Sequence, residues 1–394
     1  MTKKKNWQDY RSATQAVRAG QVRSSEQEHS EPIYTTSSFV FDSAEQAAAR
    51  FSYQEQGNVY SRFTNPTVNV FEQRLAALEG GEACVATSSG MSAMLSICMS
   101  GLEYGDHIVS SSSIFGASQI LINNILSKFG VSSTFVDLVD LTAWRDALTK
   151  NTKIVFFETP TNPTTEIGDI AGISDIVKKY NKDIKVVVDN CFCTPVLQRP
   201  LELGADVVMH SATKFIDGQG RGVGGAVVGD SEFVGEQVFS FMRTAGPSMS
   251  PFNAWIFVKG LETMALRVNQ ASENAKQIAH WLIEQEAVEH VYYPGLETHP
   301  QYELAQSQQS KAGAILSFKL SGGREAAWKA INSTQLLSIT ANLGDTRSTI
   351  THPYTTTHAR WSDKDKVAVN INEGLVRLAI GLEDPLDIIE DLHF

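Results

Sequence analysis

Short apolar runs alternate with helix-like segments through much of the chain. The runs are rich in Val, Ile and Phe and are bounded by polar or Gly-containing turns, which is typical of buried strands in a parallel sheet. The segments between them carry apolar residues at helical spacing. We therefore predict an α/β domain over residues 51–247, with a mostly parallel sheet covered by helices on both faces. The predicted strands are 83–87, 108–110, 133–136, 153–157, 184–188, 206–209 and 225–228. The predicted helices are 66–78, 92–99, 118–128, 141–148 and 173–180.

The two ends of the chain have different hydrophobic patterns from the central part. Residues 1–50 hold few long apolar runs, so we expect an N-terminal arm that packs on the main domain or on another subunit. Residues 248–394 begin with a long helix-like segment and continue with an alternating, half-buried strand at 314–320 and a further strand at 375–380. This pattern predicts a smaller C-terminal α+β domain.

Composition narrows the classes of protein to consider. The chain has 394 residues and a formal net charge of −11, which disfavours a nucleic-acid partner because phosphates bind basic faces. No apolar run is long enough to span a bilayer, and no apolar signal core follows the N-terminus. Four cysteines without CxxC spacing suit a reducing compartment. We therefore expect a cytoplasmic protein with no membrane partner. The histidines form no HxxxH or HExxH arrangement, so we expect no metal.

Lys214 lies just past a predicted buried strand, residues 206–209. Ligands of open α/β sheets collect at such strand ends, and lysine forms imines with carbonyl compounds. Ser211 and Thr213 precede it, and their hydroxyls could bind phosphate oxygens. Pyridoxal 5'-phosphate combines an aldehyde with a phosphate. We therefore predict it as the cofactor, with Lys214 as its attachment point.

Asp189 ends the apolar run of residues 186–188. A carboxylate at the end of a buried strand is unfavourable unless a partner awaits it. A protonated pyridine nitrogen is such a partner, because Asp189 would keep the ring an electron sink. The alternative is a strand-end Asp that caps the next turn. Lys214 downstream favours the cofactor interpretation.

Two further segments carry groups that could bind a phosphate. Ser89, Gly90 and Met91 lie between a strand and a helix, where backbone N–H groups can face an anion. The alternative is an ordinary turn. Tyr60 and Arg62 present a phenol and a guanidinium two residues apart, on one side of an extended segment. The alternative is an exposed loop.

Two further residues could contact the cofactor ring and the substrate. Asn162 lies in a proline-stiffened loop after a strand, where it could face the ring hydroxyl. Arg377 lies in a late strand, and a buried arginine needs an anion such as a substrate carboxylate. An internal Asp or Glu partner is the alternative. The GxGxxG match at 220–225 precedes a strand, which is the wrong context for a dinucleotide site.

Four motifs occur in order along the chain: YSRFTNPT at 60–67, ETPTNP at 158–163, VVVDN at 186–190 and SATK at 211–214. As a set they resemble the Cys/Met-metabolism family of pyridoxal-phosphate enzymes. The resemblance covers nearly the whole chain and implies the type I aminotransferase-like fold. It also implies a homotetramer built from two dimers.

The resemblance implies a role for each candidate residue. Lys214 would form the imine, Asp189 would hold the ring nitrogen, and Arg377 would anchor the substrate α-carboxylate. Tyr60 and Arg62 would clamp the phosphate of a neighbouring subunit, with Tyr60 also beside the substrate. The implied phosphate contacts within the subunit are Ser89, Gly90, Met91, Ser211 and Thr213.

Two departures from the common family pattern indicate a branch. Phe115 stands where many members stack a tyrosine on the ring, which keeps the stacking but removes a hydroxyl. Asn342 opens an Asn-Leu-Gly-Asp loop beside the expected substrate site, where many members have Ser-Leu-Gly-Gly. Together with the run at 352–358, these features resemble the O-succinylhomoserine sulfhydrylase branch.

That branch implies homocysteine formation from an O-acylated homoserine, as the succinyl ester, and sulfide. The alternatives are a cystathionine γ-synthase, which uses cysteine, an acetyl-ester enzyme and a γ-lyase. A non-catalytic α/β binding protein is an alternative of another class.

Overall fold

A seven-stranded sheet forms the centre of the computed structural model, which describes residues 6–394. The strand order is β1-β7-β6-β5-β4-β2-β3, and only β7 runs antiparallel to its neighbours. The predicted mostly parallel α/β sheet is therefore confirmed. The strands are β1 (Ala83–Thr87), β2 (His107–Ser111), β3 (Ser132–Val136), β4 (Thr152–Glu158), β5 (Lys185–Asp189), β6 (Val207–Ser211) and β7 (Gly225–Gly229).

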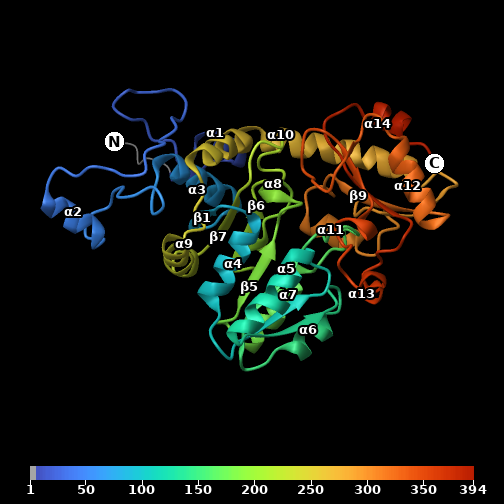
Figure 1. The fold of residues 1–394 in the computed structure, drawn as a ribbon, viewed down its shortest axis with the longest axis horizontal. Coiled ribbons are helices and arrows are strands. Elements are labelled where there is room, and N and C mark those ends of the chain that lie inside the picture. Colours follow the sequence, from blue (N-terminus) through green and yellow to red (C-terminus); the bar gives the residue numbers. More distant parts are fainter. Residues whose placement is uncertain (1–5) are drawn as a thin grey trace.

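Helices cover both faces of this sheet, as Figure 1 shows. One face packs against α4 (Gly90–Gly101) and the helical residues 233–245. The other face packs against α3 (Pro66–Glu79), α6 (Leu141–Ala147), α7 (Ile170–Tyr180) and α10 (Pro251–Leu282). Local sequence sets several of these helix boundaries. Asn65 caps α3, Pro66 occupies its first turn, and Gly80 ends it with a left-handed φ of 79°. The helices of this part are α3 (Pro66–Glu79), α4 (Gly90–Gly101), α5 (Gly116–Ile120), α6 (Leu141–Ala147), α7 (Ile170–Tyr180), α8 (Thr194–Leu197) and α9 (Phe239–Ala245).

The single helix predicted over residues 118–128 is wrong. The chain forms the short helix α5, a π-helical turn at Leu121–Ile125 and a 3₁₀ turn at Leu126–Phe129. Apolar residues of this stretch, Leu121, Ile122 and Leu126, are nevertheless buried together against α4. Hydrophobic spacing predicted the buried face but could not distinguish between these related helical geometries. Similar 3₁₀ or π segments are Trp7–Asp9, Pro200–Leu203, Phe233–Val238 and Pro353–Thr355.

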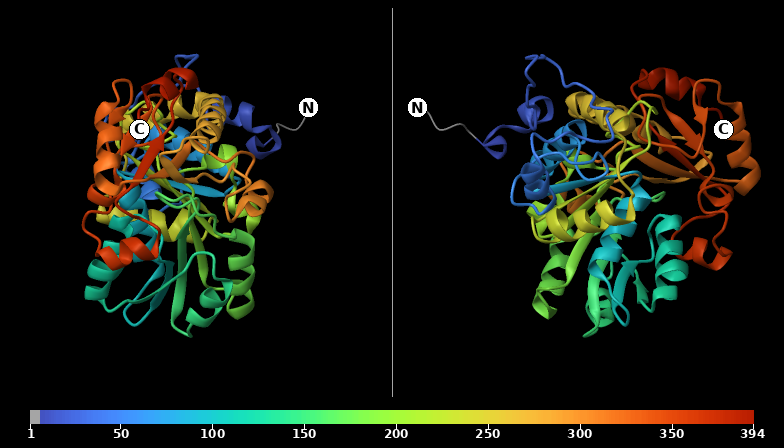
Figure 2. Two further views of the ribbon diagram at one scale, coloured as in Figure 1. Left: turned by 90° about the vertical axis from the view of Figure 1, so that its right-hand side faces the viewer. Right: turned by 60° about the vertical axis from the view of Figure 1, so that its left-hand side comes forward.

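A second sheet lies beside the first towards the C-terminus (Figure 2). Its strand order is β10-β11-β12-β9-β8. The strands are β8 (Val288–Tyr292), β9 (Ile315–Leu320), β10 (Ser338–Ile339), β11 (Thr349–Thr351) and β12 (Leu375–Ala379). The helices are α11 (Tyr302–Gln308), α12 (Gly323–Ser333), α13 (Asp363–Ala368) and α14 (Pro385–Asp391). A separate apolar core joins this sheet to α12, α14 and the end of α10.

The long helix α10, Pro251–Leu282, runs along both sheets (Figure 1). It packs on α3 near the first sheet and on β9 and α14 near the second. The division into an arm of residues 1–50, a domain of 51–247 and a domain of 248–394 remains a proposal.

The N-terminal segment contacts the body through its first α-helix and again through residues 31–34. Helix α1, Ser12–Arg18, packs on α3 and α10. Helix α2, Ala44–Phe51, has no buried residue and lies away from both sheets at the left of Figure 1. Within residues 6–394, we find no helix that is both long and apolar enough to cross a bilayer.

Candidate active site

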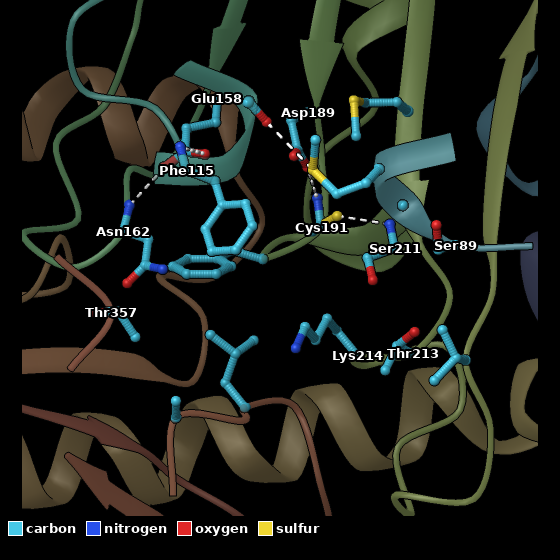
Figure 3. A pocket seen from close by; sticks show the side chains of 18 of the residues that line it. Ser89, Phe115, Glu158, Asn162, Asp189, Cys191, Ser211, Thr213, Lys214 and Thr357 are labelled. Atoms are coloured by element: carbon cyan, nitrogen blue, oxygen red, sulfur yellow. Dashed lines mark hydrogen bonds between the residues drawn. The ribbon is translucent and has the colours of Figure 1, made fainter. Parts of the chain in front are cut away.

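A cavity of about 250 Å³ opens at the carboxyl ends of β4, β5 and β6, where loops that connect strands of the second sheet approach (Figure 3). Carboxyl ends of neighbouring parallel strands meet at one edge of a sheet, so side chains that follow different strands converge there. Nine of the predicted site residues line this cavity. They are Ser89, Gly90, Met91, Phe115, Asn162, Asp189, Ser211, Thr213 and Lys214.

Lys214 lies three residues past the end of β6 and is half-buried in the cavity. Its Nζ donates a 2.8 Å hydrogen bond to Oδ1 of Asn342. Burial lowers the pKa of the Lys214 amine, and the nearby guanidinium of Arg377 lowers it further. A lowered pKa increases the fraction of neutral amine at physiological pH. The amine is therefore suited to act as a nucleophile and as a base.

Asp189 ends β5 and lines the same cavity as Lys214. Its Oδ1 accepts a 3.0 Å hydrogen bond from the backbone N–H of Cys191. Burial raises the pKa of Asp189, and the hydrogen bonds from Cys191 oppose that rise. A positively charged group in the cavity would stabilise the ionised form of this half-buried carboxyl.

The start of α4, residues 89–91, lines the cavity and has the form expected of an anion cradle. Ser89 caps the helix: its Oγ accepts from Ser92 N at 3.1 Å, and its own N donates to Ser92 Oγ at 2.8 Å. Within the described chain, the N–H groups of Gly90 and Met91 have no partner. A Cβ built on Gly90 would lie 2.8 Å from Cβ of Ser211, so only glycine allows this close approach. Free N–H groups at a helix start suit a phosphate.

Phe115 and Asn162 are held by one carboxyl. Glu158 Oε2 accepts from Phe115 N at 2.9 Å, and Oε1 accepts from Asn162 N at 2.8 Å (Figure 3). Sequence reasoning placed Glu158 at the start of the ETPTNP motif but assigned it no function. Its position at a strand end, like that of Asp189, was the available signal.

Arg377 lies in β12 of the second sheet and is 1% exposed. Its Nη1 donates to Asn162 Oδ1 at 3.0 Å, and Nη2 donates to the Ala341 carbonyl at 2.9 Å. Its buried Nε has no partner. Over residues 6–394, no Asp or Glu forms an ion pair with this guanidinium, so the alternative of an internal acidic partner is not supported. Burial lowers the pKa of Arg377 to about 10, which leaves it charged near neutral pH.

Asn342 does not line the cavity, but its neighbours Ala341 and Leu343 do. Its side chain bonds Lys214, and the predicted place of Asn342 beside the substrate stays a prediction.

Tyr60 and Arg62 are not brought to the cavity of their own chain. Arg62 Nη1 donates to the carbonyl of Arg243, and its guanidinium stacks on Phe63, with 4.8 Å between Cζ and the ring centroid. Tyr60 is 42% exposed. Their predicted contact with the phosphate of a neighbouring subunit stays a prediction.

Comparison with known proteins assigns the family. The model of the Cys/Met metabolism PLP-dependent enzymes matches residues 13–394. The chain belongs to this family. Pyridoxal phosphate (PLP) is therefore its cofactor, and the protein is an enzyme. The cavity fits this group: it offers a lysine amine, a carboxylate and a helix start with free N–H groups.

Individual family members resemble the chain over nearly its full length. It is 53% identical to the O-succinylhomoserine sulfhydrylase of Pseudomonas aeruginosa over 379 residues, covering 96% of this chain and 93% of that protein. It is 44% identical to the L-methionine gamma-lyase of Treponema denticola, covering 96% and 95%. A solved Campylobacter jejuni structure, described as a candidate O-acetylhomoserine (thiol)-lyase, aligns with a TM-score of 0.94 at 33% identity, covering 97% of this chain and 98% of that one. That structure carries a pyridoxyl-lysine monophosphate.

Proposed function

We propose that this enzyme replaces the succinyloxy group of O-succinylhomoserine by sulfide, giving homocysteine and succinate. The observation that carries the proposal is the 53% identity, over 96% of the chain, with the P. aeruginosa O-succinylhomoserine sulfhydrylase. In the reaction the bond between Cγ and the ester oxygen breaks, and its electron pair leaves with succinate. Hydrosulfide supplies the sulfur that bonds Cγ and keeps its proton as the product thiol.

The substrate is an amino acid, and Arg377 is proposed to bind its α-carboxylate. A buried guanidinium without an acidic partner favours a carboxylate ligand, which it can hold through two parallel hydrogen bonds. Asn162 and the Ala341 carbonyl orient the guanidinium from two sides. A substrate held by Arg377 would lie beside Lys214, because Asn342 accepts hydrogen bonds from both side chains, through Oδ1 from Lys214 Nζ and through its carbonyl from Arg377 Nη2.

Bound PLP supplies an electron sink that stabilises negative charge at the substrate carbons. Asp189 would hold the proton on the ring nitrogen, and Phe115 would stack on the ring. The neutral amine of Lys214 would remove the proton from Cα and move protons at Cβ. Asn162 would face the ring hydroxyl. The phosphate would lie on Ser89, Gly90 and Met91 and on the hydroxyls of Ser211 and Thr213.

The cradle is proposed to be completed by a second copy of the chain. Tyr60 and Arg62 lie outside the cavity of their own chain, on a segment beside the projecting helix α2. In a dimer, Arg62 of each subunit could bind the phosphate in the other, and Tyr60 could lie beside the substrate. We propose a homotetramer made of two such dimers.

The main rival is γ-elimination, which is favoured by the 44% identity to the T. denticola L-methionine gamma-lyase. A cystathionine γ-synthase or an acetyl-ester enzyme would differ in the sulfur donor or in the leaving group. These reactions share removal of the Cα proton, so the residues named above serve all of them.

One set of assays separates these functions. The purified enzyme with PLP is supplied with O-succinylhomoserine or O-acetylhomoserine, each with sulfide or cysteine, and separately with methionine alone. We expect homocysteine from the succinyl ester and sulfide to form with the highest kcat/KM. Higher kcat/KM with cysteine, or faster 2-oxobutanoate formation from methionine, would refute the proposal. Lys214→Ala is the inactive control.

A further inference from the structure

Glu158 is a buried carboxyl in the wall of the active site. It ends β4, and the register of β4 on β5 pairs it with Asp189. Paired residues of neighbouring strands point to the same face of a sheet. The two carboxyls therefore lie beside each other, and both line the cavity.

Burying the Glu158 carboxyl at this position costs free energy unless its hydrogen bonds offset that cost. Glu158 is 6% exposed, and within the described part of the chain no Lys, Arg or His forms an ion pair with it. Burial first, and the charge of Asp189 next, raise the pKa of Glu158 to about 8. A buried carboxyl without a cation opposes folding. The contacts of Glu158 should therefore indicate what it contributes.

Each carboxyl oxygen of Glu158 accepts a hydrogen bond from a different loop. Oε2 accepts from the N–H of Phe115, the residue that precedes α5, and Oε1 accepts from the N–H of Asn162, in the loop after β4 (Figure 3). The Asn162 side chain in turn accepts from Arg377. One carboxyl therefore connects two cavity-lining loops of the first sheet with the guanidinium of the second.

We propose that Glu158 is a positioning residue of this enzyme, which aligns the side chains of Phe115 and Asn162 on the bound cofactor from a single carboxyl beside Asp189. The inference deepens the proposed function, because it rests on the cofactor contacts proposed there for Phe115 and Asn162. A glutamine cannot replace the carboxyl in this arrangement. It has one acceptor oxygen, so its NH₂ group would face one of the two N–H donors.

The test compares Glu158→Gln with Glu166→Gln, as holoenzymes alongside the wild type. Glu166 is a matched control because burial also raises its pKa and it lies in the same segment, yet it does not line the cavity. Two readouts are measured: the PLP dissociation constant, and the visible circular dichroism of bound PLP, which reports its fixed orientation. Neither uses a substrate, so an error in the proposed acyl or sulfur donor would not affect the result.

We expect Glu158→Gln to weaken PLP binding up to about tenfold, the effect of one lost hydrogen bond, and to reduce the visible dichroism. Glu166→Gln should match the wild type in both. Unchanged values in Glu158→Gln, or equal changes in the two variants, would overturn the proposal. If Glu158→Gln does not fold, Glu158→Asp replaces it, because its shorter side chain cannot reach both N–H groups. A wild-type result for Glu158→Asp would then overturn the proposal.

Discussion

Asn342 holds the amine of Lys214 through a 2.8 Å hydrogen bond to its Oδ1. The two residues come from different sheets, since Lys214 follows β6 and Asn342 lies between β10 and β11. The backbone carbonyl of Asn342 also lies 3.4 Å from Nη2 of Arg377. One residue in a loop of the second sheet therefore contacts both the proposed base and the proposed carboxylate anchor.

Asn342→Ala should slow the reaction and leave the cofactor bound. The substitution frees the amine of Lys214 to rotate, and the loss of one hydrogen bond to a charged or polarised group corresponds to about a tenfold to hundredfold decrease in kcat. Steady-state kinetics and the absorption of bound PLP measure the two effects separately. Asn332→Ala, at an exposed position of α12, is the control. A wild-type kcat in Asn342→Ala would exclude this role.

Arg377→Lys should raise KM more than it changes kcat. Lysine keeps a positive charge but lacks the planar fork that holds a carboxylate through two hydrogen bonds. It also cannot contact Asn162 and the Ala341 carbonyl at once in the present geometry. We expect KM for the amino-acid substrate to rise about tenfold or more. Arg324→Lys, in an exposed pair with Glu373, should leave KM unchanged. An unchanged KM in Arg377→Lys would remove this residue from the substrate site.

The sequence predicted elements best where local signals and burial agree. The strand predicted at 83–87 is β1, and the helix predicted at 66–78 is α3, which Asn65 and Gly80 delimit. Strand β8 was not predicted, because its Glu289 and His290 are exposed and interrupt the apolar pattern. Its pairing with β9 comes from tertiary structure, which local propensity does not contain.

The candidate site, too, could be predicted from the sequence only in part. Asp189 and Lys214 could be predicted because each follows an apolar strand, and parallel strands bring their ends together. The bond between Lys214 and Asn342 could not, because it depends on how the second sheet lies against the first. The unpaired state of Arg377 likewise became visible only with all its neighbours in place.

Gly90→Ala should weaken cofactor binding without unfolding the enzyme. The new Cβ would lie 2.8 Å from Cβ of Ser211 and 3.1 Å from its Cα, so the start of α4 would have to shift. That shift moves the N–H groups proposed to bind phosphate. We expect the PLP dissociation constant to rise at least about tenfold, measured by titration of the cofactor-free enzyme. Gly222→Ala, whose Cβ would make ordinary contact with Phe257, is the control. Equal affinity in the two variants would contradict the proposed cradle.

Glu31→Gln should destabilise the fold by detaching the N-terminal segment from α3 and α10. Glu31 Oε1 lies 2.6 Å from Arg74 Nη2, and Oε2 lies 2.6 Å from Lys259 Nζ. The Arg74 side chain is fully buried, so removing the Glu31 charge leaves it with only the longer, 3.4 Å pair to the partly exposed Glu262. We expect a loss of about 3 kcal/mol at pH 7, measured by urea unfolding. Glu273→Gln, in an exposed pair with Lys311, should cost less than about 1 kcal/mol.

The effect of Glu31→Gln should also depend on pH in one direction. Burial alone would raise the pKa of Glu31, but hydrogen bonds from Lys259 and Arg74 together lower it to about 2. A carboxyl with a lowered folded pKa contributes stability that is fully present above its unfolded pKa and is lost as the pH falls towards the folded one. The difference in unfolding free energy between wild type and Glu31→Gln should therefore be constant from pH 7 to about pH 5, and should shrink as the pH falls further towards 2. A difference that stays constant down to pH 3 would show that Glu31 carries no such ion pair.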